Sequence, residues 1–391
     1  MRGLTDTRTS SDQRSGRDLR VDFFRGLALL FIFLDHVPNN AAAWLTVRNF
    51  GFSDAAEIFV FLSGYSAALA YYPRIERGGL CYGIAATLHR AWRIYVAHVF
   101  LLIVSIVLVL LVTDYFANPD YLQEMNLVGF RAAPLESLLQ SLLLRFRAGN
   151  MDVLPLYVLL MACAAPMLGL MRRWPGYTLG AAALLWMLAA HFNWNLGTYP
   201  QGGAWLFNPF CWQFLFVIGS ACALHPARLQ PLFAARRWLL PLALLYLGTC
   251  FALVLTWYFP RLEPLVPDWL ARTLYPINKS NLDMLRLVHF LALAYLASSY
   301  VPRRAPWLQA APARALVLCG QHSLPIFCLG IVLAFLAHVC LVQIGSSVGM
   351  QYFVSACGCM LLIATASVLN WYKTYPLRPR ATYTIQYSES T

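Results

Sequence analysis

Long apolar segments alternate with short polar segments along this chain. A helix crosses the hydrocarbon core of a bilayer in about 20 apolar residues. The pattern therefore predicts an all-α, polytopic membrane protein with about ten transmembrane helices. These are expected, with loose boundaries, at 21–37, 54–72, 94–113, 152–170, 177–192, 205–224, 238–258, 284–301, 316–341 and 350–371.

Composition supports this class. The 391 residues are 60% hydrophobic and only 12% charged, which is too apolar for a soluble protein of this length. We expect one transmembrane domain at 20–372, flanked by a disordered tail at 1–19 and a second tail at 373–391. The ten cysteines lie almost entirely in apolar segments and show no C-x-x-C spacing, so we expect neither a zinc site nor a disulfide framework.

The basic residues set the expected orientation. Six polar segments on one predicted side hold 21 of the 29 Lys and Arg residues, and the segments between them hold the other eight. Cytoplasmic loops are enriched in Lys and Arg, so both termini are predicted to be cytoplasmic. The net charge of +12 is therefore attributed to topology, and no nucleic-acid partner is expected.

Polar chemistry is concentrated at the two ends of the first apolar segment. Arg25 lies near its start and His36 at its finish, eleven positions later. Eleven steps of about 100° return to nearly the same face, and the rise is roughly 16 Å. Ionisable groups at membrane depth are costly and usually face a protein interior or a wet cavity. This segment is therefore interpreted as one wall of an internal route.

His36 is the candidate general base, because imidazole titrates near neutral pH. Asp35 is its neighbour, although adjacent helical residues point about 100° apart. Other carboxylates could orient the ring: Asp54 and Glu57 at the start of the second segment, or Asp152 at the start of the fourth. The simpler alternatives are an interfacial histidine and helix-capping carboxylates.

Arginines gather on the predicted cytoplasmic side. Arg90 and Arg93 share a helix face before the third segment, and Arg25 enters the first. Guanidinium groups bind phosphate bidentately, so these three are candidates for holding an anionic cofactor. His322 interrupts the ninth segment and could line the same route. The alternatives are topological anchors for the arginines and an interhelical hydrogen bond for His322.

Several stretches of this chain resemble one protein family. Arg25 and His36 resemble the Arg-x10-His pattern of the acyltransferase 3 superfamily, and Arg90-Ala-Trp-Arg93 resembles its cytoplasmic Arg-x-x-Arg motif. More closely, five stretches resemble the OpgC family: DHVPNN (35–40), MDVLPLY (151–157), NPFCWQFLF (208–216), KSNLDMLRLVHF (279–290) and LCGQHSLPIFCLG (318–330). That family is linked to succinylation of osmoregulated periplasmic glucans.

The resemblance implies a multi-pass protein of the bacterial inner membrane. Acyl-CoA, expected to be succinyl-CoA, would be the cytosolic donor, and a periplasmic glucan hydroxyl the acceptor. His36 would then be the base, with phosphates at Arg25, Arg90 and Arg93. Oxyanion stabilisation would come from Asn39, Asn40 or Lys279, and the acyl carboxylate would pair with Lys279 or Arg48. The predicted substrate-binding set is Asn39, Asn40, Arg48, Asp54, Lys279 and Asp283.

Two other classes of function fit the same pattern. A glycan or lipid-linked sugar exporter would use the polar route to conduct substrate. A membrane sensor or assembly subunit would carry no chemistry. An acyltransferase consumes acyl-CoA, an exporter moves its substrate without altering it, and a sensor does neither.

Overall fold

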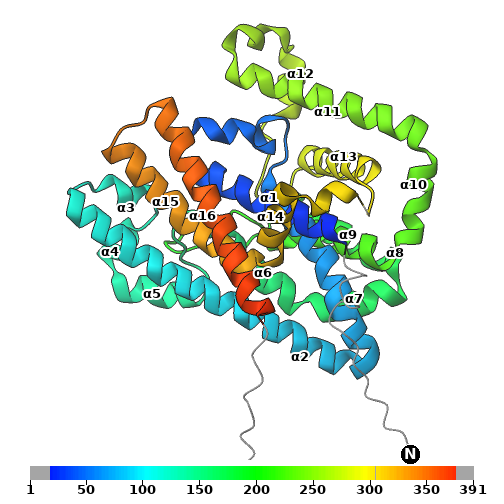
Figure 1. The fold of residues 1–391 in the computed structure, drawn as a ribbon. Coiled ribbons are helices and arrows are strands. Elements are labelled where there is room, and N and C mark those ends of the chain that lie inside the picture. The colour runs from blue at the N-terminus through cyan, green and yellow to red at the C-terminus, as the bar shows by residue number, and fades with distance from the viewer. Residues whose placement is uncertain (1–17, 304, 376–391) are drawn as a thin grey trace, which may run out of the picture.

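The computed structural model describes residues 18–303 and 305–375. Within these residues the regular secondary structure is helical, apart from an isolated bridge between Gly197 and Ala204 (Figure 1). The predicted tails at 1–19 and 373–391 lie largely outside the described residues, so the disorder predicted for 1–19 is untested.

The α-helices, in chain order, are α1 (Leu19–His36), α2 (Ala55–Phe116), α3 (Asp120–Glu124), α4 (Val128–Ala132), α5 (Pro134–Leu142), α6 (Val153–Ala162), α7 (Ala164–Arg173), α8 (Pro175–His191), α9 (Pro209–Leu224), α10 (Gln230–Ala234), α11 (Arg236–Tyr258), α12 (Asp268–Leu274), α13 (Met284–Tyr300), α14 (Ala311–Gln321), α15 (Ser323–Gln343) and α16 (Val348–Thr374). Short 3₁₀ helices are η2 (Ala41–Leu45), η3 (Val47–Asn49), η4 (Pro226–Leu229), η5 (Pro260–Leu265) and η6 (Pro306–Gln309).

Each of the ten predicted apolar segments overlaps a helix. By length and composition, four helices of the described chain could cross a membrane: α2, α11, α15 and α16. The number rises to six if the bent pairs α6–α7 and α9–α10 each count as one span. Helix α1 has 18 residues but carries four charged ones. The segment predicted at 316–341 is broken at His322, between α14 and α15. The total of ten spans, and the side on which the termini lie, stay predictions.

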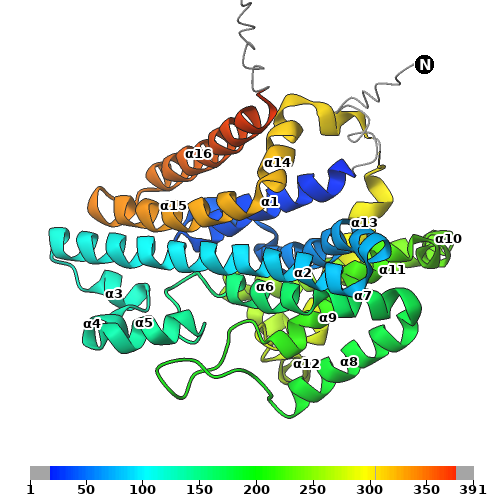
Figure 2. The same cartoon turned by 90° about the horizontal axis from the view of Figure 1, so that it is seen from below.

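Helix α2 reverses direction within its length, and so contains two of the predicted segments. The reversal is at Gly79, whose φ of 77° and ψ of 174° are non-helical and favour glycine. Figure 2 shows α2 between two groups of helices, with α1 and α14 to α16 on one side and α6 to α9 on the other. The chain reversal brings 55–78 and 80–116 into the same central layer.

Helix α1 packs at backbone distance against α14. A Cβ atom at Gly26 would lie 1.9 Å from the carbonyl oxygen of Leu316, and one at Gly320 would lie 1.9 Å from that of Asp22. Gly64 brings α2 equally close to α9, with a Cβ position 2.0 Å from the Phe216 carbonyl oxygen. Small residues at helix crossings allow this close approach in membrane proteins.

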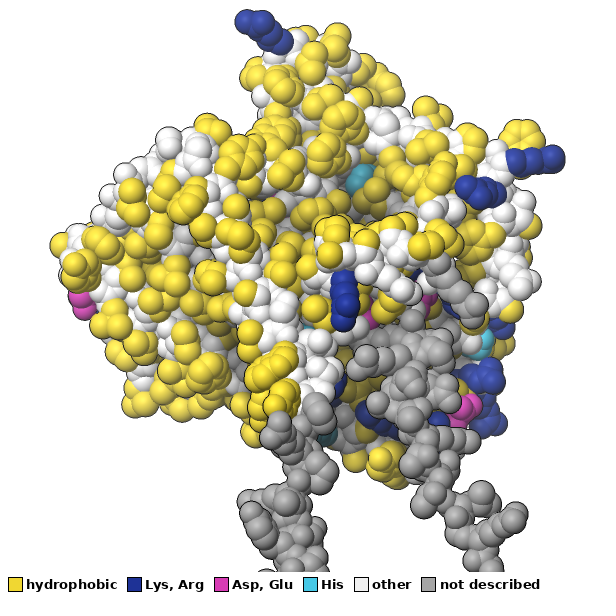
Figure 3. All heavy atoms as spheres, in the orientation of Figure 1, with side chains coloured by type: hydrophobic (Ala, Val, Ile, Leu, Met, Phe, Trp, Pro, Cys, Tyr) yellow, Lys and Arg dark blue, Asp and Glu magenta, His cyan; other side chains and the backbone are white. Residues whose placement is uncertain are grey.

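The outer surface is strongly apolar. Figure 3 shows hydrophobic side chains over most of one face, with Lys and Arg side chains mainly near its edges. Large exposed side chains include Phe100 and Leu111 on α2, Leu245 on α11 and Val368 on α16. Such a surface suits contact with lipid and identifies this chain as a membrane protein.

Candidate active site

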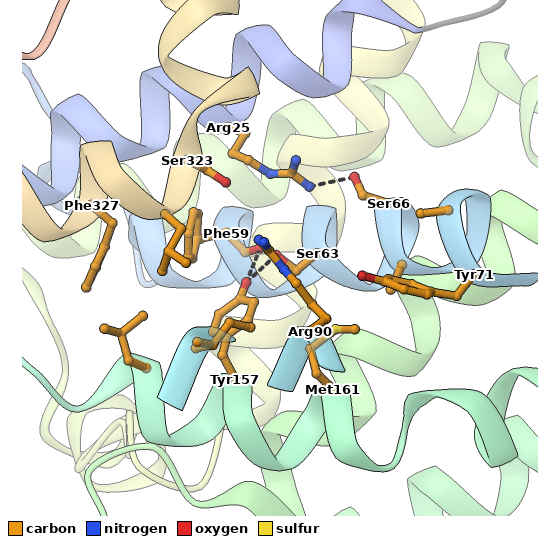
Figure 4. A pocket seen from close by; sticks show the side chains of 15 residues that line it. Arg25, Phe59, Ser63, Ser66, Tyr71, Arg90, Tyr157, Met161, Ser323 and Phe327 are labelled. Atoms are coloured by element: carbon orange, nitrogen blue, oxygen red, sulfur yellow. Dashed lines mark hydrogen bonds between the residues drawn. The ribbon is translucent and has the colours of Figure 1, made fainter. Parts of the chain in front are cut away.

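Two cavities lie against α1, one near each end. The cavity at the Arg25 end, here the arginine cavity, has a volume of about 240 Å³ (Figure 4). The cavity at the His36 end, here the histidine cavity, has a volume of about 580 Å³. Arg25 and His36 therefore line different cavities from one helix, whereas the sequence predicted a single route along a shared face.

Two guanidinium groups face the arginine cavity. Arg25 extends from α1, where its Nη2 donates to the carbonyl oxygen of Leu62 at 2.8 Å and to Oγ of Ser66 at 2.5 Å. Arg90 extends from the second part of α2, and Figure 4 shows it pointing toward Arg25. No carboxylate pairs with Arg90 in the described part of the chain. The cavity thus has a local excess of positive charge, which suits an anionic ligand.

Hydroxyl groups complete this cavity. The Tyr157 hydroxyl, on α6, donates to the carbonyl oxygen of Phe59 at 2.7 Å and also bonds Oγ of Ser63. Ser66 and Ser323 line the same space. Sequence analysis did not identify Tyr157 or Ser66 as site residues, because α6 and α2, which bring them to Arg25, are far from it in sequence.

The other two predicted cofactor residues do not line the arginine cavity. Arg93 is exposed and does not line the cavity, although it lies on the same side of the helix as Arg90, about 60° around the axis. His322 occupies the break between α14 and α15, and the next residue, Ser323, faces the cavity instead. The grouping of Arg93 and His322 with Arg25 has no support in this geometry.

His36 lines the histidine cavity without an orienting carboxylate. Its Nδ1 atom is buried and has no hydrogen-bond partner among the described residues. Asp35 is turned elsewhere: its Oδ1 accepts from Thr46 Oγ1 at 2.7 Å and lies 3.9 Å from Arg48 Nη1. Asp35 therefore acts on the loop after α1 and does not orient the imidazole.

Four charged residues form a buried ionic cluster at one wall of the histidine cavity. Asp54 Oδ2 lies 2.6 Å from Lys279 Nζ and 3.1 Å from Arg286 Nη2. Arg286 also contacts Glu57 Oε1, with Nη2 at 2.6 Å and Nε at 2.8 Å. Two cations and two carboxylates balance formally. Asp54, Lys279 and Arg286 line the cavity.

Local structure explains why both carboxylates of this cluster stand at the start of α2. Asp54 is the N-cap and accepts from the Ala56 N–H at 2.8 Å, and Glu57 accepts from the Asp54 N–H at 2.9 Å. This reciprocal arrangement is a capping box. Glu57 lies behind the cavity wall, fully buried, so it holds Arg286 and does not face a substrate. The ion pairs of Arg286 with these two carboxylates were not predicted from the sequence.

A second ion pair borders the same cavity. Asp152 lines the cavity, and its Oδ1 lies 3.3 Å from Nη1 of the buried Arg147. The guanidinium of Arg147 stacks over the Trp205 ring at 4.8 Å. Burial lowers the pKa of Arg147 and the Asp152 carboxylate raises it. Asp152 is therefore held by a fixed cation and does not contact His36.

Two of the predicted substrate residues cap helices, and a third is exposed in a turn. The Asn40 side chain accepts from the Ala42 N–H at 3.1 Å and from Ser355 Oγ at 3.1 Å, so it caps η2 and ties it to α16. Asp283 caps α13 by accepting from the Leu285 N–H at 2.9 Å. Asn39 is exposed in the turn after α1, with a φ of 51°. None of the three lines the histidine cavity.

One aromatic residue lines both cavities. Phe327, on α15, borders the arginine cavity together with Phe59 and borders the histidine cavity near Val153. Phe327 is thus the one lining residue that the two cavities have in common.

Among the described residues, no group of His, Cys, Asp and Glu side chains could hold a metal ion.

Comparisons with known proteins place the chain in a family. A family model described as OpgC protein matches residues 17–374, which is nearly the whole chain. Searches of curated proteins and of solved structures gave no match. Membership suggests a glucan-modifying acyltransferase, and so a transferase embedded in a membrane. With its family match over almost its full length, the chain belongs to the OpgC family.

Proposed function

We propose that this protein transfers an acyl group, succinyl, from acyl-CoA to hydroxyl groups of a periplasmic glucan. The observation that carries the proposal is the pair of cavities on α1, one with two guanidinium groups and one with an imidazole. Family membership supports the reaction class. Separate donor and acceptor cavities suit a reaction between one substrate on each side of a membrane.

The arginine cavity is the proposed donor site. Arg25 and Arg90 would hold phosphate groups of CoA, since guanidinium binds phosphate through two parallel hydrogen bonds. Its volume of about 240 Å³ is smaller than most small-molecule sites, which are roughly 300–1,000 Å³. It would therefore hold the phosphates and the adjoining arm, with the nucleotide outside.

The histidine cavity is the proposed acceptor site. A neutral His36 nitrogen would take the proton of a sugar hydroxyl as its oxygen forms a bond to the thioester carbonyl carbon. The carbon–sulfur bond then breaks, and the departing CoA thiolate receives the proton. Lys279 is the cation best placed for charge on the acyl group, because Asp54 takes one of its three hydrogens and its side chain is 37% exposed.

The proposed sidedness follows the basic residues. Both termini and the arginine cavity would be cytoplasmic, and the histidine cavity periplasmic, in a multi-pass protein of the bacterial inner membrane. A separation of roughly 16 Å between Arg25 and His36 along α1 would let one extended thioester arm reach from its phosphates to the base.

Replacement of His36 by Ala tests the proposal. We expect the rate of glucan acylation to fall by a factor on the order of 10²–10⁴, which is the usual contribution of a positioned base. Mass analysis of periplasmic glucan, with the membrane level of the protein measured in parallel, would report it. His225→Ala is the control, since the His225 ring bonds the Met171 carbonyl oxygen at 3.0 Å and lines neither cavity. Near-normal acylation with His36→Ala would refute the mechanism.

A further inference from the structure

Phe327 is where the two cavities meet. It is 3% exposed, and its ring stacks on that of Phe59 with centroids 6.1 Å apart and planes at 20°. The Phe59 ring in turn contacts the Tyr157 ring at 5.2 Å. These three rings come from α15, α2 and α6, and all are buried. Together they form an aromatic wall of the arginine cavity, and Phe327 extends this wall to the histidine cavity.

The three rings are not held equally. Tyr157 is fixed by two hydrogen bonds from its hydroxyl, to the backbone of α2 and to Ser63. Phe59 sits on the same stretch of α2. Phe327 has no polar anchor, and it lies about one turn after the break at His322. Neither the Phe59 ring nor the Phe327 ring is held by a hydrogen bond, but Phe327 is the ring that lines both cavities, so its rotation is the movement that would join them.

We infer that Phe327 separates the donor and acceptor cavities and determines which acyl groups pass between them. The inference rests on the proposed function. A thioester arm that joins phosphates in the arginine cavity to the base in the histidine cavity must pass this ring. A narrow acyl group such as acetyl or succinyl passes when the ring turns away. A group as wide as a phenyl ring cannot share the space with it.

The first test makes space at position 327 and asks whether a wider acyl group is then accepted. Phe327→Ala removes a phenyl group from the protein, and benzoyl-CoA carries a phenyl group on the donor. We expect the ratio of kcat/KM for benzoyl-CoA to that for acetyl-CoA to rise at least about tenfold in the variant, the scale on which apolar sites discriminate by size. Phe335→Ala is the matched control, because Phe335 lies about two turns further along α15, is 5% exposed and lines neither cavity.

A ratio that stays unchanged in Phe327→Ala, or rises equally in Phe335→Ala, would overturn the inference.

The second test needs no catalysis. Ser323→Cys places a thiol in the arginine cavity, and Leu206→Cys places one in the histidine cavity. In sealed vesicles, a membrane-impermeant maleimide is applied from the side at which the thiol of the Leu206→Cys variant reacts. Labelling in excess of that of the ten native cysteines is measured.

We expect little labelling at position 323 from that side in the otherwise native chain. Faster labelling by about tenfold or more is expected when Phe327→Ala is added, because the apolar barrier is then open. No acceleration would overturn the inference even if acyl transfer is confirmed. Accelerated labelling in a protein that uses neither CoA ester would support the partition and refute the proposed function. The two failures are therefore distinguishable.

Discussion

Replacement of Arg286 by Met tests the buried ionic cluster on which the wall of the histidine cavity depends. The change keeps the volume and apolar stem but removes three charged contacts, two to Glu57 and one to Asp54. Asp54 keeps Lys279 at 2.6 Å, whereas Glu57 keeps only the Asp54 backbone N–H. The cost therefore comes mainly from Glu57, which is fully buried.

Breaking a buried ion pair from one side costs about 3–5 kcal/mol, because it leaves an uncompensated charge. We expect Arg286→Met to lose about that much stability. Glu57→Gln combined with Arg286→Met removes the orphaned charge, and this double variant should recover about 2 kcal/mol or more of the loss. Arg48→Met is the control: its side chain is 49% exposed and 3.9 Å from Asp35, so we expect a change of about 1 kcal/mol or less.

The assay is equilibrium unfolding in mixed micelles with a rising fraction of SDS, followed by the fluorescence of the tryptophans. A loss for Arg286→Met as small as that for Arg48→Met would show that the cluster is solvated and weak. A double variant less stable than Arg286→Met would show that Glu57 holds α2 through its backbone contact alone. Either result would remove the electrostatic explanation for the shape of this wall.

Three further predictions concern the donor site, the acyl group and the helix packing. Arg90→Ala should weaken binding of a CoA ester by about tenfold or more, because a charge-assisted hydrogen bond is lost, whereas Arg93→Ala should leave binding unchanged. Titration calorimetry in detergent would measure both affinities, and equal effects of the two substitutions would contradict the assignment. Lys279→Met should depress succinyl transfer more than acetyl transfer, and an equal loss in rates with the two CoA esters would remove Lys279 from the acyl carboxylate. Gly64→Ala should destabilise the protein by about 1–3 kcal/mol, because its new Cβ meets a carbonyl oxygen of α9, whereas a Cβ at Gly180 meets nothing within 4 Å; in SDS unfolding, a Gly180→Ala loss as large as that of Gly64→Ala would refute the packing argument.

The placement of Arg25 and His36 could be predicted from sequence because it depends only on helix geometry. The two residues belong to one unbroken helix, so their spacing alone determined that they share a face. The same holds for Asp54 and Glu57, which meet in a capping box within one turn. Local spacing is sufficient wherever one element contains both partners.

Partners from different elements could not be predicted in this way. Arg286 contacts Glu57 across 229 positions of the sequence, and Tyr157 contacts Ser63 across 94. Asn40 carried the right chemistry for a substrate contact, but the start of η2 needed a cap and took it. A reversal between the segments at 54–72 and 94–113 was predicted, but its position at Gly79 was not, because the residues on both sides of this glycine are helical. The role of such residues depends on which backbone groups need a cap and on which helices pack together, and neither can be read from local spacing.

The glycine contacts between α1 and α14 affect how a substrate can be placed along α1. Because the two backbones touch at Gly26 and Gly320, α1 cannot slide along α14 without lifting away from it. Helix α1 itself fixes the separation of Arg25 and His36, and the contact with α14 fixes where this pair of residues lies along the neighbouring helices. A donor that binds as proposed would have to span this separation of roughly 16 Å to contact both residues at once. A thioester with a shorter arm would contact either Arg25 or His36, and could not contact both at once however tightly its phosphates bind.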